Sequence, residues 1–161
     1  MSARVSIQTE DFDLTQEIDK LRLSDLRVGA VCSFVGTVRD TRAMTGQAAD
    51  EVEFMTLEHY PGMTEKAITE IIDQARGRWE VLDALVIHRV GTLKPTDQIV
   101  LVIVASTHRG DAFAACEFIM DYLKTRAPFW KKEITPQGAR WVDARVTDDK
   151  AAERWQGGEK S

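Results

Sequence analysis

Cysteine and proline are scarce in this sequence, and long apolar runs are absent. Only two cysteines and four prolines occur in 161 residues. Cys32 and Cys116 form no CxxC pair, which argues against a disulfide framework, a zinc knuckle and a thioredoxin-type motif, so we expect both to be small core residues. The longest apolar run, Ile99 to Ala105, has seven residues, whereas a membrane-spanning helix needs about 20. We therefore expect no contact with a membrane.

Basic residues are also in deficit. Lysine and arginine number 21 against 26 aspartates and glutamates, which gives a formal charge of −5. This balance argues against the broad basic face that nucleic-acid binding needs. No apolar segment follows Arg4 as it would in a secretory signal, so we expect a cytoplasmic protein. The composition, with 43% hydrophobic and 29% charged residues, is that of one globular domain, which we expect to cover residues 1–161.

The apolar periodicity predicts helices that alternate with strands. Helical spacing covers 14–26, 63–79 and 110–126, the second of these with Thr64 as its cap. Alternating or β-branched stretches predict strands over 5–9, 29–38, 51–59, 82–90, 98–106, 129–134 and 140–145. We expect a loop over 40–50 and a polar tail over 147–161 that frays. Hairpin-connected strands favour an α+β fold, with helices packed on a mixed or antiparallel sheet. A doubly wound nucleotide fold is disfavoured, because neither common phosphate-binding glycine motif is present.

The polar turn from Ser106 to Asp111 predicts an anion site. It lies where the 110–126 helix is expected to begin, and a helix N-terminus presents unpaired N–H groups and a partial positive charge. His108 and Arg109 would complete a site for phosphate or carboxylate there. The alternative is a solvated turn in which Arg109 merely faces water, and spacing alone leaves both open.

Basic residues concentrate between Lys124 and Lys132, against the acidic balance of the chain. This stretch holds four cations and no acid in nine residues. Lys124 falls just outside Phe113 at the edge of the helix's apolar arc, where burial and nearby cations favour the neutral amine that acts as nucleophile or base. Alternatively, its stem covers apolar surface while the ammonium stays in water. Lys131 and Lys132 begin a strand on opposite faces, so only one can point where Lys124 points.

Four further residues are candidates on weaker grounds. Arg39 and Arg42 lie where the 29–38 strand opens into a loop, a common place for binding residues, although a lone arginine there is usually surface. His59 and His88 show neither HxH nor HExxH spacing, so we expect no metal site. His88 lies on the apolar side of its strand and is expected to be a core histidine.

Four motifs carry a recognisable pattern. They are Leu57-Glu58-His59-Tyr60-Pro61-Gly62-Met63-Thr64, Val86-Ile87-His88-Arg89-Val90-Gly91, Ser106-Thr107-His108-Arg109 and Asp121-Tyr122-Leu123-Lys124-Thr125-Arg126-Ala127-Pro128-Phe129-Trp130-Lys131-Lys132. Together they resemble the large, catalytic subunit of molybdopterin synthase, and the likeness runs from about Gly29 to Arg145 in unbroken order. The resemblance implies an α/β-hammerhead-type fold with an additional small β subdomain. It also implies a homodimer that binds a small ubiquitin-like subunit at each end, as a heterotetramer.

The resemblance further implies a sulfurtransferase of molybdenum cofactor biosynthesis. The small subunit's C-terminal Gly-Gly, carried as a thiocarboxylate, would give sulfur to cyclic pyranopterin monophosphate, and two rounds would form the dithiolene of molybdopterin. No cofactor of its own is implied. Catalytic positions map onto Lys124 and Lys131, and substrate-binding positions onto Thr37, Val38, Arg39, His108, Arg109, Lys132 and Glu133.

These residues suggest a division of roles. As a hypothesis, Lys124 is a general base or amine catalyst beside the thiocarboxylate carbonyl, with Phe113 and Met120 on its apolar side. Lys131 would stabilise negative charge on the intermediate. Arg39, His108 and Arg109 would hold phosphate and pterin.

Two other classes of function remain open from the sequence. One is a non-catalytic adaptor that only docks a ubiquitin-like partner, and the other is an enzyme that forms a lysine Schiff base with a carbonyl substrate or with pyridoxal phosphate. The sequence also leaves open whether Arg140 and Arg145 act within one subunit or across a dimer.

Overall fold

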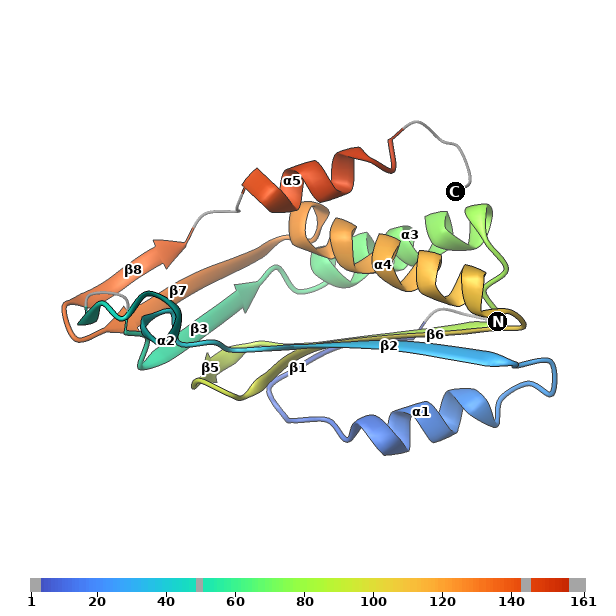
Figure 1. The fold of residues 1–161 in the computed structure, drawn as a ribbon, viewed down its shortest axis with the longest axis horizontal. Helices are drawn as coiled ribbons and strands as arrows, with labels where there is room; N and C mark the ends of the chain where they lie inside the picture. The colour runs from blue at the N-terminus through green and yellow to red at the C-terminus, as the bar shows by residue number, and fades with distance from the viewer. Residues whose placement is uncertain (1–3, 49–50, 143–145, 157–161) are drawn as a thin grey trace.

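Two four-stranded sheets organise the chain (Figure 1), and the computed structural model describes residues 4–48, 51–142 and 146–156. The first sheet has the order β1-β4-β6-β2, with β1 parallel to β4 and the other pairs antiparallel. Its strands are β1 (Arg4–Gln8), β2 (Ala30–Thr37), β4 (Asp83–Arg89) and β6 (Gln98–Ser106). The expected mixed sheet is confirmed, and the predicted 82–90 and 98–106 strands are antiparallel neighbours.

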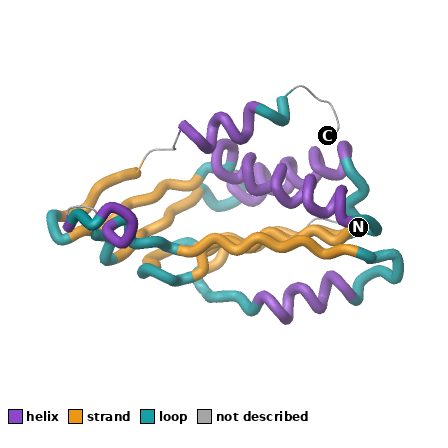
Figure 2. Tube along the Cα trace, in the orientation of Figure 1, coloured by secondary structure: helices purple, strands orange, loops and turns teal. Residues whose placement is uncertain are grey.

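Helices cover both faces of this sheet (Figure 2). They are α1 (Leu14–Arg22) on one face, and α3 (Met63–Arg78) and α4 (Arg109–Arg126) on the other. Along β4, Ala84 and Val86 join the core beneath α3 and α4, whereas Leu85 and Ile87 join the core beneath α1. Successive side chains of a strand alternate between faces. Because both faces are buried, the middle of each central strand is continuously apolar, over 84–87 in β4 and 99–105 in β6.

The second sheet is the small β subdomain, with the antiparallel order β5-β3-β7-β8. Its strands are β3 (Phe54–His59), β5 (Gly91–Leu93), β7 (Phe129–Thr135) and β8 (Gly138–Val142). Met55 and Leu57 face a separate core with Val38 and Leu93. The chain enters this sheet directly after β4, where Gly91 adopts a φ of 88° that a side chain would strain. The expected fold class is confirmed.

Thr64 ties the start of α3 to the end of α4. Its buried hydroxyl accepts a hydrogen bond from the Tyr60 N–H at 3.2 Å and donates one to the Pro128 carbonyl at 3.1 Å. The expectation that Thr64 caps α3 is wrong, because the N-cap is Gly62, whose N–H donates to the Glu65 side chain at 3.1 Å. These bonds fix where the chain leaves α4 for β7.

The 40–50 loop and the C-terminal tail contain more structure than expected. Short α2 (Arg42–Thr45) lies in the loop, and α5 (Val146–Glu153) lies in the tail. Trp155 is 8% exposed, packs edge-on against Trp79 and Phe118, and donates its indole N–H to Asp121 at 2.7 Å. The prediction of a frayed tail is therefore wrong up to residue 156. Residues 49–50, 143–145 and 157–161, including the end of the predicted 140–145 strand, lie outside the described residues.

Both cysteines are free thiols that pack with the core beneath α3 and α4. Cys116 is buried and Cys32 is half-buried, and burial raises the pKa of the Cys116 thiol. This agrees with the expected packing role. Within the part of the chain that the structure describes, no helix has the length and apolar character to cross a membrane.

Candidate functional site

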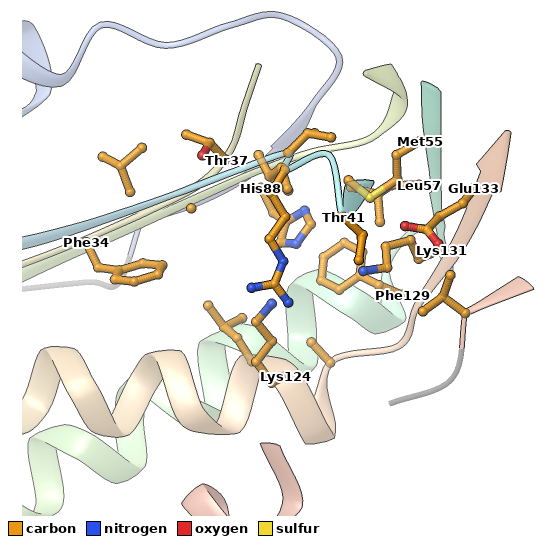
Figure 3. Close-up of a pocket in the computed structure, with 18 residues that line it drawn as sticks. Phe34, Thr37, Thr41, Met55, Leu57, His88, Lys124, Phe129, Lys131 and Glu133 are labelled. Carbon is orange, nitrogen blue, oxygen red and sulfur yellow. The ribbon is translucent and has the colours of Figure 1, made fainter. Parts of the chain in front are cut away.

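A cavity of about 660 Å³ lies where the two sheets meet. The end of β2, the last turns of α4 and the start of β7 surround it (Figure 3). Its apolar lining includes Phe34, Met55, Leu57, Leu123 and Phe129. Sequence analysis did not single out these side chains, because their apolar positions resemble ordinary core. The cavity combines apolar walls with several cations and suits a flat anionic molecule.

Lys124 and Lys131 face this cavity together. Lys124 comes from the last turn of α4 and Lys131 from β7, and Figure 3 shows both side chains turned toward the same space. Lys132 lies on the other face of β7, with its Nζ 5.3 Å from the centre of the Trp141 ring. The expectation that only one of the two adjacent lysines faces Lys124 is confirmed.

Thr37, Val38 and Arg39 line the cavity at the end of β2. The strand register shifts between Gly36 and Thr37, which re-aims the residues that follow. Val38 donates its N–H to the Asp97 carbonyl at 2.9 Å and accepts one from Thr96 at 2.8 Å. This pairing fixes the backbone beside Arg39, whose side chain is exposed.

Glu133 supplies a carboxylate to the cavity wall. One of its oxygens accepts a hydrogen bond from the Arg140 Nε at 3.2 Å, so this acid is paired within its own chain. Arg145, the other arginine whose position the sequence left open, lies outside the described residues.

His108 and Arg109 do not line the cavity. His108 is the N-cap of α4, and Arg109 begins the helix. At about 1.5 Å per residue, the 15 residues from Arg109 to Lys124 span roughly 22 Å, which is far beyond the reach of an arginine side chain. Both side chains are exposed. Six of the nine predicted site residues therefore gather in one cavity, and Lys132, His108 and Arg109 lie elsewhere.

Glu80 adds a negative charge near this helix start. Its carboxylate accepts the Thr107 N–H at 3.1 Å and the Ser106 hydroxyl at 3.4 Å. These hydrogen bonds, Thr107 foremost, lower the pKa of Glu80. The start of α4 therefore carries a negative side chain beside its positive helix terminus, a combination that sequence spacing did not indicate.

Phe113 does not form an apolar side for Lys124. It is 62% exposed, and a separation of 11 positions in the sequence places the two residues roughly 16 Å apart along the helix axis. The expectation is wrong because arc position ignores this axial distance. Leu123, Ala127 and Phe129 line the cavity with Lys124 instead.

His88 is a cavity residue that the sequence analysis assigned to the core. Its ring stacks on Phe129 with centroids 3.8 Å apart and planes at 18°. Its Nδ1 lies 2.8 Å from the Arg89 carbonyl oxygen. Burial, with a smaller effect from the charges of Lys124 and His59, lowers the pKa of His88 to about 4. One sequence signal could have indicated a site: His88 is the second-last residue of β4, where the strand leaves the core.

The state of the His88 ring follows from these contacts. A pKa of about 4 leaves the ring neutral at pH 7, so it carries one proton. The Arg89 carbonyl can only accept, so Nδ1 must hold that proton and donate it. Nε2 is then an uncharged acceptor.

Burial of a neutral His88 predicts a loss of stability in acid. The unfolded chain binds a proton near the ordinary pKa of 6.5 and the folded chain only near 4, so stability falls as pH drops from 6.5 toward 4. Between pH 7.5 and 5 we expect the free energy of unfolding to fall by about 2 kcal/mol through this group. Urea unfolding of wild type and His88→Phe at both pH values measures the difference, and equal pH dependence of the two proteins would contradict it.

Among the described residues, no three His, Cys, Asp or Glu side chains gather in a way that could hold a metal ion. The cavity instead places Arg39, Lys124 and Lys131 around an apolar floor. Such an arrangement can bind a phosphorylated heterocycle and stabilise negative charge that develops during a reaction.

The fold and the cavity define a class of protein. It is an α+β protein in which a small antiparallel sheet and the end of a long helix hold two lysines around a partly apolar cavity. The family model described as MoaE protein matches residues 7–126. The chain belongs to this family, which confirms the resemblance carried by its four motifs.

Named relatives and solved structures that are similar to this chain support its membership of the MoaE family. The molybdopterin synthase catalytic subunit of Ralstonia nicotianae is 64% identical over 151 residues, which cover 94% of this chain and 83% of that protein. The structure of the molybdopterin biosynthesis MoaE protein from Burkholderia ambifaria is 57% identical, with a TM-score of 0.80 over 95% of this chain and 97% of that one. A complex of subunits 1 and 2 of the molybdopterin-converting factor from Helicobacter pylori shares the fold, with 19% identity and a TM-score of 0.68 over 88% and 91% of the two chains.

Proposed function

We propose that this protein is the catalytic subunit of a molybdopterin synthase, and that it moves sulfur from a carrier's C-terminal thiocarboxylate to cyclic pyranopterin monophosphate. The observation that carries the proposal is the shared cavity of Lys124 and Lys131. The names of its relatives support the same activity. The cytoplasm is the proposed compartment, which agrees with two free thiols.

The two lysines have different tasks in this proposal. The thiocarboxylate sulfur displaces an oxygen from a carbon of the pterin substrate, and that oxygen leaves as water once it is protonated. A second water then adds to the carbonyl of the resulting thioester and breaks its carbon–sulfur bond, so the carrier leaves as a carboxylate and the sulfur stays on the pterin. Lys124 takes up and returns the proton of that water with its amine, and Lys131 offsets the negative charge that collects on the carbonyl oxygen. Leu123, Ala127 and Phe129 restrict water around the reacting groups, which strengthens these charge interactions.

Two partners complete the proposed assembly. A small ubiquitin-like subunit supplies the sulfur, and the two-subunit complex of the Helicobacter pylori relative supports such a pairing. A second copy of this chain supplies His108 and Arg109. Both are exposed and too far along α4 to reach the cavity of their own chain. The heterotetramer would then hold two composite sites.

Reconstitution tests this function directly. The protein is mixed with a thiocarboxylated small subunit and cyclic pyranopterin monophosphate, and dithiolene-bearing pterin is measured by fluorescence after oxidation. We expect product with two carriers consumed per pterin, and none from a carrier that ends in an ordinary carboxylate.

Two other outcomes would contradict the proposal. Tight binding of the small subunit without any product would indicate an adaptor. Inactivation by borohydride only when a carbonyl substrate is present would indicate a Schiff-base enzyme, because borohydride reduces the imine to a stable amine.

A further inference from the structure

His88 has a fixed orientation at the edge of the cavity. Phe129 holds one face of the ring, and the Arg89 carbonyl holds its Nδ1–H. The ring is thereby held at its face and at one edge, so the opposite nitrogen, Nε2, points in a defined direction.

The lone pair of Nε2 opens on the cavity. Within the described part of the chain no hydrogen-bond partner is found for Nε2, and the atom is not among the unpartnered side-chain atoms that are sealed from solvent. His88 lines the cavity, and Figure 3 shows its ring beside Phe129 at the cavity wall. The ring edge opposite the Arg89 bond is therefore the one that can meet a ligand there.

The charged groups around His88 do not occupy this acceptor. Lys124 of α4 places positive charge near the ring, His59 of β3 is the other titratable group that acts on it, and Arg39 and Lys131 line the same cavity. Glu133, the carboxylate of the cavity wall, is paired with Arg140. The cations suit a phosphate, whereas an uncharged nitrogen acceptor suits an N–H of a neutral ring.

We propose that the Nε2 atom of His88 accepts a hydrogen bond from a ring N–H of the reduced pterin, and so selects the reduced substrate over its oxidised form. The inference rests on the proposed function, from which it takes the pterin. Oxidation of the ring removes hydrogens from its nitrogens. The oxidised ring therefore presents a lone pair to the lone pair of Nε2, and two acceptors cannot bond.

Calorimetric titration of the purified protein measures this selection. The two ligands are cyclic pyranopterin monophosphate, kept anaerobic, and its air-oxidised aromatic form. We expect wild type to bind the reduced form about tenfold more tightly. His88→Phe keeps a ring on Phe129 but has no acceptor, so it should bind the reduced form about tenfold more weakly and show no preference.

Two further variants separate a binding role from a structural one. His88→Gln places an amide near Nε2 that can turn either its oxygen or its NH₂ to the ligand, so it should recover affinity for the reduced form without selecting against the oxidised form. His59→Phe changes the other histidine that approaches Phe129, with centroids 6.5 Å apart, but not the cavity lining. It should bind both ligands as wild type does.

Kinetics give an independent readout. In the reconstituted reaction His88→Phe should raise KM for the pterin about tenfold and leave kcat within about twofold, because the lost bond holds the substrate rather than the reacting sulfur. Thermal unfolding reports whether the variant folds. If it does not, the wild-type preference and His88→Gln decide the question.

The outcomes test the role of His88 separately from the proposed synthase activity. Wild type that makes product but binds both pterin forms equally overturns the role of His88 alone, as does an unchanged affinity in folded His88→Phe. Wild type that binds neither form and makes no product overturns the proposed function as well.

Discussion

Lys124→Ala is expected to lower kcat for dithiolene formation about 10³-fold, the usual contribution of a positioned acid–base group. Lys124 faces the cavity with Lys131, and the other cation of the lining, Arg39, is a guanidinium that cannot lose its proton at neutral pH. No second amine comes from α4, because Lys124 is its one lysine. KM for the pterin should change far less than kcat, since the phosphate is held by other groups.

Two matched variants show why kcat falls in Lys124→Ala. Lys124→Arg keeps the positive charge without a transferable proton, so it should remain as inactive as Lys124→Ala. Lys66→Ala makes the same truncation at an exposed position of α3 outside the cavity, and it should keep full activity. Turnover by Lys124→Ala near the wild-type rate would contradict the catalytic role, and strong rescue by arginine would reduce that role to charge alone. Binding of the small subunit, measured separately, should not change.

Local periodicity was sufficient for much of the fold and part of the site. The two-residue repeat of a strand placed Lys131 and Lys132 on opposite faces, and the structure puts Lys131 in the cavity and Lys132 over Trp141. The same repeat, together with unbroken apolar runs, located β4 and β6. Such features depend on near neighbours in the chain, which is why a single sequence reveals them.

Contacts between distant segments could not be predicted in this way. His88 has the pattern of a core residue, and only the stacking of Phe129 from β7 makes it part of a cavity wall. Trp155 lies in a polar tail, and its burial depends on Trp79, which directly follows α3, and on Phe118 of α4. In each case the partner is at least 37 residues away in the chain.

The anion site illustrates a different limit. The Ser106 to Asp111 turn has the residues of a phosphate site, and the basic stretch after Lys124 has those of a reaction site. Sequence analysis combined the two, but α4 separates them along nearly its full length. Because α4 is stiff, Arg109 and Lys124 of one chain stay at opposite ends of it. The two residues can meet in one site only if they come from different chains.

A composite site across a homodimer predicts that two impaired chains restore activity to each other when the pterin concentration is below the raised KM. Lys124→Ala and Arg109→Ala chains, coexpressed with different affinity tags and purified through both, form dimers with one chain of each kind. If Lys124 of one copy works with Arg109 of the other, one site of each such dimer is intact and the second carries both changes. We expect about half of the wild-type activity per dimer, as the two-fold symmetry of a homodimer requires.

The reverse pairing is the control. A chain that carries both substitutions, joined with a wild-type chain, keeps about half activity only if each site is built within one chain. In the composite arrangement one of its sites lacks Lys124 and the other lacks Arg109, so little activity should remain. Arg109→Ala alone should raise KM for the pterin about 50-fold through the lost charge-assisted contact. Half activity in the double-variant pairing, with none in the single-variant pairing, would place Arg109 and Lys124 in one chain's site, which the roughly 22 Å between their positions on α4 opposes.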